Sequence, residues 1–273
     1  MRDWIRRRGL VILGAVAVAI VVLGTALASY AREDALGPVG QYFDSAGVPI
    51  HYTDEGEGTP VVLVHGFGNP ANLQWRRNGQ IAALRKHYRV IALDNRGHGR
   101  SGKPHDPEAY GVEMVKDLVR LLDHLGLERA HIVGYSMGGF IALKMVAMYP
   151  DRILSAAACA AGWEQDTPEN REFAQGVARA VLRGETGPLA QRLGIRETGS
   201  SYVHRLEVWA AISWFNDPRA LSAVALGSRQ LTLTEAELRA NSVPTLTIIG
   251  SEDGLLPDAQ ALHAVMANHE VIV

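Results

Sequence analysis

A serine placed between two glycines has the sequence setting most suited to catalysis. Residues 134–138 form a G-x-S-x-G motif with Ser136 at its centre, and they lie between a short apolar run and a helical pattern. A nucleophile on such a strand-to-helix turn needs a strained backbone, and Gly134 and Gly138 leave room for the close approach of neighbouring chain. The free N–H groups at the start of the following helix can stabilise a developing oxyanion. The pattern therefore predicts that Ser136 is a nucleophile.

A second glycine-containing loop follows the apolar run at 61–64. His65 and Gly66 begin this loop, and the glycines on either side of Phe67 allow the backbone to turn sharply. We expect the Phe67 N–H to face Ser136 and to form a two-donor oxyanion hole with the Met137 N–H. His65 comes directly after the predicted strand, and we expect it to shape the loop through hydrogen bonds and not to act as a base.

Alternating strand-like and helix-like segments must position these loops. Short β-branched runs alternate with longer helical patterns, which predicts a mostly parallel, doubly wound α/β sheet with helices on both faces. The predicted helices include residues 71–87, 107–125 and 137–149. Residues 162–241 contain helical patterns only, so we interpret them as a helical cap inserted between two parts of the core, residues 41–161 and 242–273.

Composition narrows the function classes. The chain has 273 residues, enough for one large domain with an insertion, and a formal net charge of −2. That charge provides no broad basic surface, so nucleic-acid binding is disfavoured. The single cysteine excludes an internal disulfide and a cysteine-based zinc site. We expect no metal, and the oligomeric state is left open.

The first 31 residues form a distinct N-terminal segment. Four arginines precede an uncharged stretch over 10–28, which is about 28 Å long as a helix and matches the hydrocarbon thickness of a bilayer. The positive-inside rule then predicts a single-pass cell-membrane protein with its catalytic domain extracytoplasmic. A cleaved signal peptide that releases a secreted or periplasmic protein is the alternative, because small residues for cleavage end the stretch. A buried core helix is the third interpretation.

Taken together, three motifs resemble the α/β-hydrolase superfamily. They are the loops at 65–68 and 134–139 and the segment 94–101 between them, and they occur in the order and at the spacing of that family. The resemblance covers about residues 41–273 and points to the serine-nucleophile, esterase-like branch. It implies a Ser–acid–His triad in that chain order and no cofactor. It also implies that Asp94, Arg96 and His98 fix a loop and are not a catalytic acid and base.

The resemblance places the catalytic acid after the next-to-last strand. Residues 250–257 are similar to the family's G-x-x-D-x-x-x-P turn, so Asp253 is the expected acid and Glu252 its solvent-facing neighbour. Asp253 would orient the histidine and offset the imidazolium charge. The alternative is that Asp253 caps the helix expected over 257–267.

The catalytic histidine has no match in this sequence. In the family it follows the last strand, for which residues 270–273 are the candidate. His263 is expected in the middle of a helix and His269 at the far end of the sheet from Ser136, so neither is favoured as the base. We expect that the chain is a truncated form of a longer protein whose histidine lies beyond Val273.

These residues predict a serine hydrolase that cleaves small carboxylic esters through an acyl-enzyme, with doubtful activity in this chain because the base is missing. The aromatic residues of the cap are candidates for lining an apolar substrate pocket, with ordinary packing in the core as the equal alternative for each: Trp163, Trp209, Trp214 and Phe215. Two alternatives stay open. One is a C–C hydrolase or lactonase of the same fold, and the other is a catalytically impaired, membrane-anchored module that binds its ligand without turnover.

Overall fold

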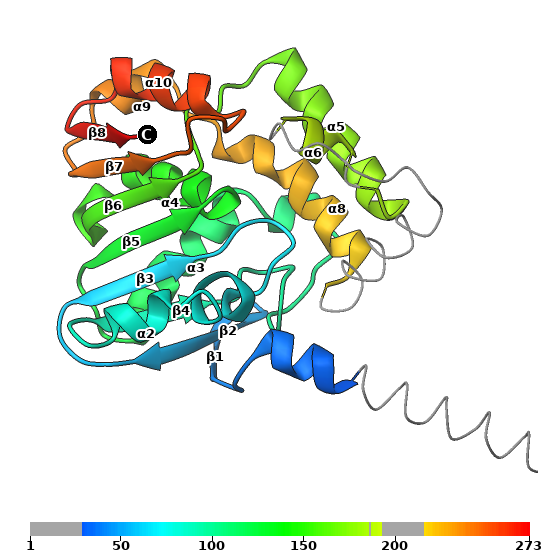
Figure 1. Cartoon of the computed structure of the whole chain (residues 1–273), viewed down its shortest axis with the longest axis vertical. Helices are drawn as coiled ribbons and strands as arrows, with labels where there is room; N and C mark the ends of the chain where they lie inside the picture. The colour runs from blue at the N-terminus through cyan, green and yellow to red at the C-terminus, as the bar shows by residue number, and fades with distance from the viewer. Residues whose placement is uncertain (1–28, 186, 193–215) are drawn as a thin grey trace, which may run out of the picture.

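The computed structural model describes residues 29–185, 187–192 and 216–273. Its centre is an eight-stranded sheet with the strand order β1-β2-β4-β3-β5-β6-β7-β8. β1 pairs with β2, and β2 with β4, in the antiparallel direction, and every later pair is parallel. The strands are β1 (Gln41–Ser45), β2 (Val48–Glu55), β3 (Pro60–Val64), β4 (Arg89–Leu93), β5 (Ala130–Tyr135), β6 (Ile153–Cys159), β7 (Thr245–Ile248) and β8 (His269–Ile272). The predicted mostly parallel α/β sheet is therefore present (Figure 1).

Helices connect the parallel strands. Those outside the β6–β7 connection are η1 (Asn72–Arg76), α2 (Gln80–Leu84), η2 (Pro107–Ala109), α3 (Val112–His124), α4 (Met137–Met148), η3 (Pro150–Arg152) and α10 (Leu256–Val265). In Figure 1, α2 lies in front of the sheet and α3 and α4 lie behind it. The largest buried cluster joins α3, α4 and α10 to the sheet, and a smaller one joins η1 and α2 to β3 and β4. Burial of apolar surface on both faces therefore fixes the strand ends that carry the motifs.

Every regular element described in the connection between β6 and β7 is a helix. The connection contains α5 (Pro168–Leu182), α6 (Gly187–Arg192), α8 (Pro218–Gly227), η4 (Ser228–Leu231) and α9 (Glu235–Arg239). α5 and α8 pack against each other through buried apolar side chains. Figure 1 shows α5, α6 and α8 together beyond one end of the strands. We call α5, α6 and α8 the helical lobe.

Two predicted helices are interrupted, each at a glycine with a positive φ. The helix expected over 71–87 is divided into η1 and α2, because Gly79 adopts φ 85° between them. The helix expected over 107–125 begins with the short η2 turn, and α3 starts only after Gly111, at φ 60°. Hydrophobic spacing survives across both interruptions, and for this reason the sequence pattern alone does not reveal them.

Strands β7 and β8 have exposed apolar side chains at the edge of the sheet. Ile248 and Ile272 are paired in register and are 43% and 54% exposed, and Val273 is 65% exposed. On the face of the smaller cluster, η1 and α2 pack over β3 and β4. The edge formed by β7 and β8 is thus less covered than the centre of the sheet.

A short helix over residues 29–36 precedes the sheet and is docked on the domain. Asn72 donates to the Asp34 carbonyl at its end (2.9 Å), and Arg100 forms an ion pair with Glu33 (2.6 Å). The predicted anchor over 1–31 lies outside the described residues except for its last three. Across the described ranges, no helix has both the length and the apolar character that a bilayer crossing requires.

Candidate active site

Ser136 lies on the turn between β5 and α4 with a strained backbone. Its φ is 51° and its ψ is −116°. Residues other than glycine rarely adopt this backbone conformation, which costs about 1–3 kcal/mol. The backbone is held there because the Ser136 N–H donates to the Cys159 carbonyl (2.8 Å) and the Gly139 N–H donates to the Ser136 carbonyl (2.7 Å). Strain maintained in this way is typical of functional residues.

The glycines of the motif are required by close backbone contacts. A Cβ at Gly134 would lie 2.0 Å from the Gly138 carbonyl oxygen, and a Cβ at Gly138 would lie 2.1 Å from the Val64 carbonyl oxygen. Each distance is shorter than any real Cβ contact. The turn can therefore pack under the end of β3 only because both positions lack a side chain.

The loop after β3 adjoins Ser136. A Cβ at Gly66 would lie 3.4 Å from the Cβ of Ser136, which places this loop directly beside the serine. Neither the Phe67 N–H nor the Met137 N–H donates a backbone hydrogen bond among the described residues. Phe67 and Met137 both line the same cavity as Ser136. Within the described residues, these two backbone donors are therefore without an acceptor and belong to residues that share the cavity with Ser136.

His65 is fully buried and holds the loop in place. Its Nε2 accepts from the Asn95 N–H (2.8 Å), so its Nδ1 carries the proton and donates to the Gly66 carbonyl (2.8 Å). Burial also lowers the pKa of His65, which keeps the ring neutral. Because both ring nitrogens are occupied, His65 has no lone pair to offer Ser136.

The loop after β4 is fixed by buried polar contacts. Asp94 accepts hydrogen bonds from the Ala71 and Arg100 N–H groups, and its pKa is lowered by its hydrogen bond with His51 against the opposing effect of burial. Arg96 forms a two-bonded ion pair with Asp117 at 2.6 and 2.7 Å. The partners of Asp94 and Arg96 named here are backbone N–H groups or buried side chains of the sheet domain, which agrees with a structural role for the loop.

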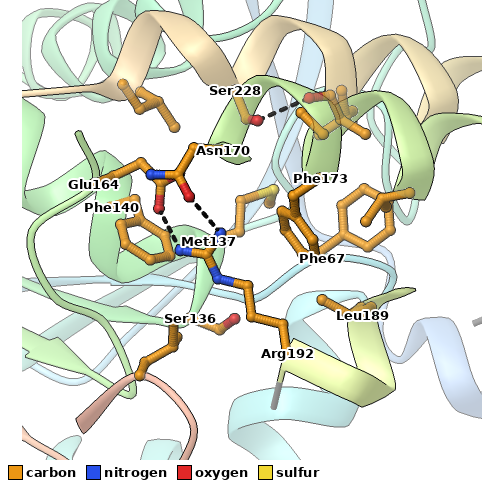
Figure 2. A pocket seen from close by; sticks show the side chains of 16 residues that line it. Phe67, Ser136, Met137, Phe140, Glu164, Asn170, Phe173, Leu189, Arg192 and Ser228 are labelled. Atoms are coloured by element: carbon orange, nitrogen blue, oxygen red, sulfur yellow. Dashed lines mark hydrogen bonds and ion pairs between the residues drawn. The ribbon is translucent and has the colours of Figure 1, made fainter. Parts of the chain in front are cut away.

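A cavity of about 110 Å³ lies at this end of the sheet and contains the Ser136 side chain (Figure 2). Residues of the loop after β3 and of the turn after β5 line it on one side, and residues of the helical lobe and η4 line it on the other. The lining is largely apolar, with aromatic rings from Phe67, Phe140 and Phe173. Such a space suits a small, mostly apolar group bound next to the hydroxyl.

The aromatic lining differs from the one expected. Trp163 does not line the cavity; its ring packs on the main core and its Nε1–H donates to the Leu233 carbonyl (2.7 Å). The expected role of Trp163 was therefore wrong, because helical spacing does not fix the direction of a side chain near a chain turn. The other aromatic candidates, Trp209, Trp214 and Phe215, lie outside the described residues.

Asp253 lies in the turn between β7 and α10. Its Oδ1 accepts from the Leu255 N–H (2.9 Å), and its carbonyl accepts from the Leu256 N–H (3.0 Å). The N-cap residue of α10 is Leu255 and has no side-chain capping bond, so Asp253 holds the turn before the helix and the expected helix cap at Asp253 is not formed. Leu255 lines the cavity, so the turn that holds Asp253 forms part of the cavity wall.

Within the described ranges, no histidine lines the cavity. His98 is buried behind Phe67, with ring centroids 5.9 Å apart, and burial lowers its pKa to about 3. His269 is the first residue of β8, so it lies at the opposite end of the sheet from Ser136, and it contacts Thr247 and His263. These positions provide no base for Ser136.

Glu164, Asn170 and Arg192 line the cavity and were not predicted from the sequence (Figure 2). They come from three places in the chain: the segment after β6, helix α5 and helix α6. No motif or regular spacing connects them. Within the described ranges, no three His, Cys, Asp or Glu side chains come together as a metal site.

Comparisons with known proteins agree with this geometry. The model of the alpha/beta hydrolase fold family matches residues 59–266. The chain is 30% identical over 240 residues to the dihydrolipoyllysine-residue acetyltransferase component of the acetoin cleaving system of Pseudomonas putida, covering 84% of this chain and 62% of that protein. It is 29% identical to the 2-hydroxy-6-oxo-2,4-heptadienoate hydrolase of Pseudomonas putida strain F1, covering 80% and 81%.

The fold is also shared with solved structures. A thermophilic esterase from Thermogutta terrifontis superposes with a TM-score of 0.66 at 28% identity, covering 86% of this chain and 89% of the esterase. The chain thus spans less than two thirds of the first relative, which is longer, and most of the second relative and of the esterase. With its family model, its sheet order and its serine turn all in agreement, the chain belongs to the α/β-hydrolase family.

Proposed function

We propose that this protein hydrolyses small carboxylic esters, with Ser136 as the nucleophile. The observation that carries the proposal is the strained Ser136 turn, which opens into the cavity beside two unpaired backbone N–H groups. Similarity to an esterase and to a C–C bond hydrolase supports a hydrolytic reaction of the same fold. C–C bond hydrolysis and lactone opening would use the same serine, and they are the alternative reactions.

The reaction proceeds in two steps. The Ser136 oxygen attacks the acyl carbon, and the Phe67 and Met137 N–H groups stabilise the oxyanion. The C–O bond to the alcohol then breaks, and the proton lost from the Ser136 hydroxyl goes to the departing alcohol oxygen. Water then attacks the acyl-enzyme and releases the acid. We assign Asp253 as the residue that orients the base, and we assign the base to none of the described histidines.

Labelling with a fluorophosphonate tests the nucleophile directly. We expect covalent modification at Ser136, found by peptide mass spectrometry, and a burst of 4-nitrophenol from 4-nitrophenyl acetate. Ser136→Ala should abolish both and leave the free energy of unfolding nearly unchanged. Because removal of a catalytic serine costs several orders of magnitude in rate, we expect turnover to fall by about 10³-fold or more. Ser155→Ala, on β6, is the matched control. Labelling that persists in Ser136→Ala would contradict the proposal.

We also propose, from the charge pattern of residues 1–31 alone, that this segment attaches the domain to the cell membrane with the domain outside. The arginines before an uncharged stretch of bilayer length support it. Extraction of membranes with alkaline carbonate tests it. An integral anchor stays in the pellet, whereas a soluble product that starts near residue 29 would instead support a cleaved signal peptide.

A further inference from the structure

The cavity beside Ser136 has a charged network set into an otherwise largely apolar wall. Among the described residues that line it, only Glu164 and Arg192 are charged. In Figure 2 the guanidinium of Arg192 lies between Glu164 and Ser136, so a bound substrate would meet this network next to the reacting serine. The chemistry of the pair therefore decides which substrates the cavity can hold.

Arg192 already has several partners. Its Nη1 donates to the Asn170 Oδ1 (2.9 Å) and its Nη2 donates to the Glu164 Oε2 (3.1 Å). The Asp258 Oδ2 lies 3.5 Å from the same Nη2, and the guanidinium carbon lies 4.6 Å from the centre of the Phe173 ring. These contacts come from two sides of the cavity and fix the position of the guanidinium.

The charges of this network do not balance. One guanidinium faces two carboxylates, those of Glu164 and Asp258, which gives the three groups a formal charge of −1. The side chains of Glu164 and Arg192 are each only 20% exposed, so water screens the imbalance incompletely. Burial raises the pKa of both Glu164 and Asp258, although Arg192 acts on each in the opposite direction. A further carboxylate would find the guanidinium already neutralised.

One oxygen of Glu164 is available to a ligand. Its Oε2 accepts from Arg192, while no hydrogen-bond donor among the described residues contacts its Oε1. An ionised carboxylate only accepts hydrogen bonds, so it complements a hydroxyl or N–H group. A buried acceptor left without a donor is unfavourable, which penalises ligands that have no such group at this position.

We propose that Glu164 determines the substrate specificity of the serine site: it neutralises Arg192 and accepts a hydrogen bond, so the cavity favours uncharged esters that carry a hydroxyl or N–H group and disfavours esters that carry a carboxylate. This inference rests on the ester hydrolysis proposed above. The competing assignment, with Arg192 as a binding site for a substrate carboxylate, predicts the opposite order of substrates.

Three methyl esters of equal chain length test the proposal: methyl pentanoate, methyl 5-hydroxypentanoate and monomethyl glutarate. With the full chain in a pH-stat, we expect kcat/KM to be at least about tenfold higher for the hydroxyl ester than for the carboxylate ester. Glu164→Gln should raise kcat/KM for monomethyl glutarate about tenfold relative to methyl pentanoate. A preference of the native protein for monomethyl glutarate would overturn the proposal.

A second series places the same groups on the alcohol side: butyl acetate, 4-hydroxybutyl acetate and 4-acetoxybutanoate. The series in which Glu164→Gln alters the order shows which half of the ester contacts the network. Unchanged ratios in both series would contradict a role for Glu164. Glu172→Gln is the control, because Glu172 lies on the exposed side of α5 and does not line the cavity. We expect this control to leave both orders of substrates as in the native protein.

Arg192→Gln separates the two assignments further. If Glu164 determines specificity, this change removes the positive charge and makes the carboxylate ester a still poorer substrate, by about tenfold. If Arg192 instead binds substrate carboxylates, the native protein prefers monomethyl glutarate and Arg192→Gln removes that preference. The unfolding midpoint of each variant, followed by circular dichroism, shows whether it is folded.

Binding to Ser136→Ala distinguishes failure of this inference from failure of the proposed reaction. Calorimetry should show tighter binding of methyl 5-hydroxypentanoate than of monomethyl glutarate even where no ester is turned over. That result would support the specificity of the cavity and leave the hydrolysis to be revised. Tighter binding of monomethyl glutarate would overturn the inference while leaving Ser136 as the nucleophile.

Discussion

Two arginine–carboxylate pairs show how differently the sheet core and the helical lobe use charge. Arg96 and Asp117 lie under the loop after β4, and their side chains are each 3% exposed. Arg192 and Glu164 face the cavity, and each is 20% exposed. The first pair has backbone partners around it and holds a loop, whereas the second is open to a ligand. Burial depth thus separates a pair that maintains the fold from one that can take part in recognition.

The largest effect on this comparison is expected from Asp117→Asn. It leaves Arg96 buried with no countercharge, and breaking such a pair costs about 3–5 kcal/mol. Urea unfolding followed by circular dichroism measures this loss. Glu113→Gln removes a carboxylate from the same helix that pairs with more exposed partners, Lys116 and Arg120, and we expect it to cost less than about 1 kcal/mol. Equal losses in the two variants would contradict the distinction by burial.

An intermediate effect is expected from adding one methyl group in each region. Gly138→Ala places a Cβ 2.1 Å from a carbonyl oxygen at the end of β3, so the backbone must move, at a cost of about 1–3 kcal/mol or more. Gly187→Ala, in α6 of the helical lobe, meets no atom within 4 Å and should stabilise by about 0.4–1 kcal/mol. Differential scanning calorimetry should show a lower unfolding temperature for Gly138→Ala and a higher one for Gly187→Ala than for the native protein. A stable, fully active Gly138→Ala protein would contradict the tight packing of the serine turn.

The smallest effect at neutral pH is expected from His98 in the core. Because burial lowers its pKa from 6.5 to about 3, the unfolded chain binds a proton in that interval that the folded chain does not. The free energy of unfolding therefore falls as the pH decreases from 6.5 toward 3, by up to about 1.4 kcal/mol per unit. His98→Gln should make this acid dependence shallower by that amount in pH-resolved unfolding curves.

The exposed His87 provides the control for that measurement, and His87→Gln should leave the acid dependence as it is. His65 and His269, whose pKa values are also lowered by burial, keep part of the dependence in every variant. If the free energy of unfolding of His98→Gln changes with pH as steeply as that of the native protein, the conclusion that His98 is buried and neutral is wrong.

The parts of the site that depend on the backbone could be predicted from the sequence. Gly134 and Gly138 are dictated by contacts shorter than any Cβ allows, so their spacing around Ser136 reports the turn itself. The strands from β2 onward followed from short apolar runs, whereas β1 was not predicted. The division of the 71–87 helix at Gly79 was missed, because apolar spacing continues across a residue whose conformation it does not determine.

The parts of the site that depend on side chains from distant segments could not be predicted. Glu164 and Arg192 are 28 positions apart and meet because α6, which packs against α5, lies close to the segment that follows β6. Trp163 shows the converse, since an aromatic residue next to Glu164 points into the core instead of into the cavity. Which side chains face a cavity is decided by the packing of the elements that carry them, and no local pattern encodes it.

The docked helix at residues 29–36 has a mechanical consequence. A hydrogen bond from Asn72 and the ion pair between Arg100 and Glu33 hold the helix on the domain. Arg100 belongs to the loop that surrounds Asp94. The first described helix is therefore held in a fixed position against the domain. A force that pulls on the chain at residue 29 therefore acts first on the Asn72 hydrogen bond and the Arg100–Glu33 ion pair, and only then on β1.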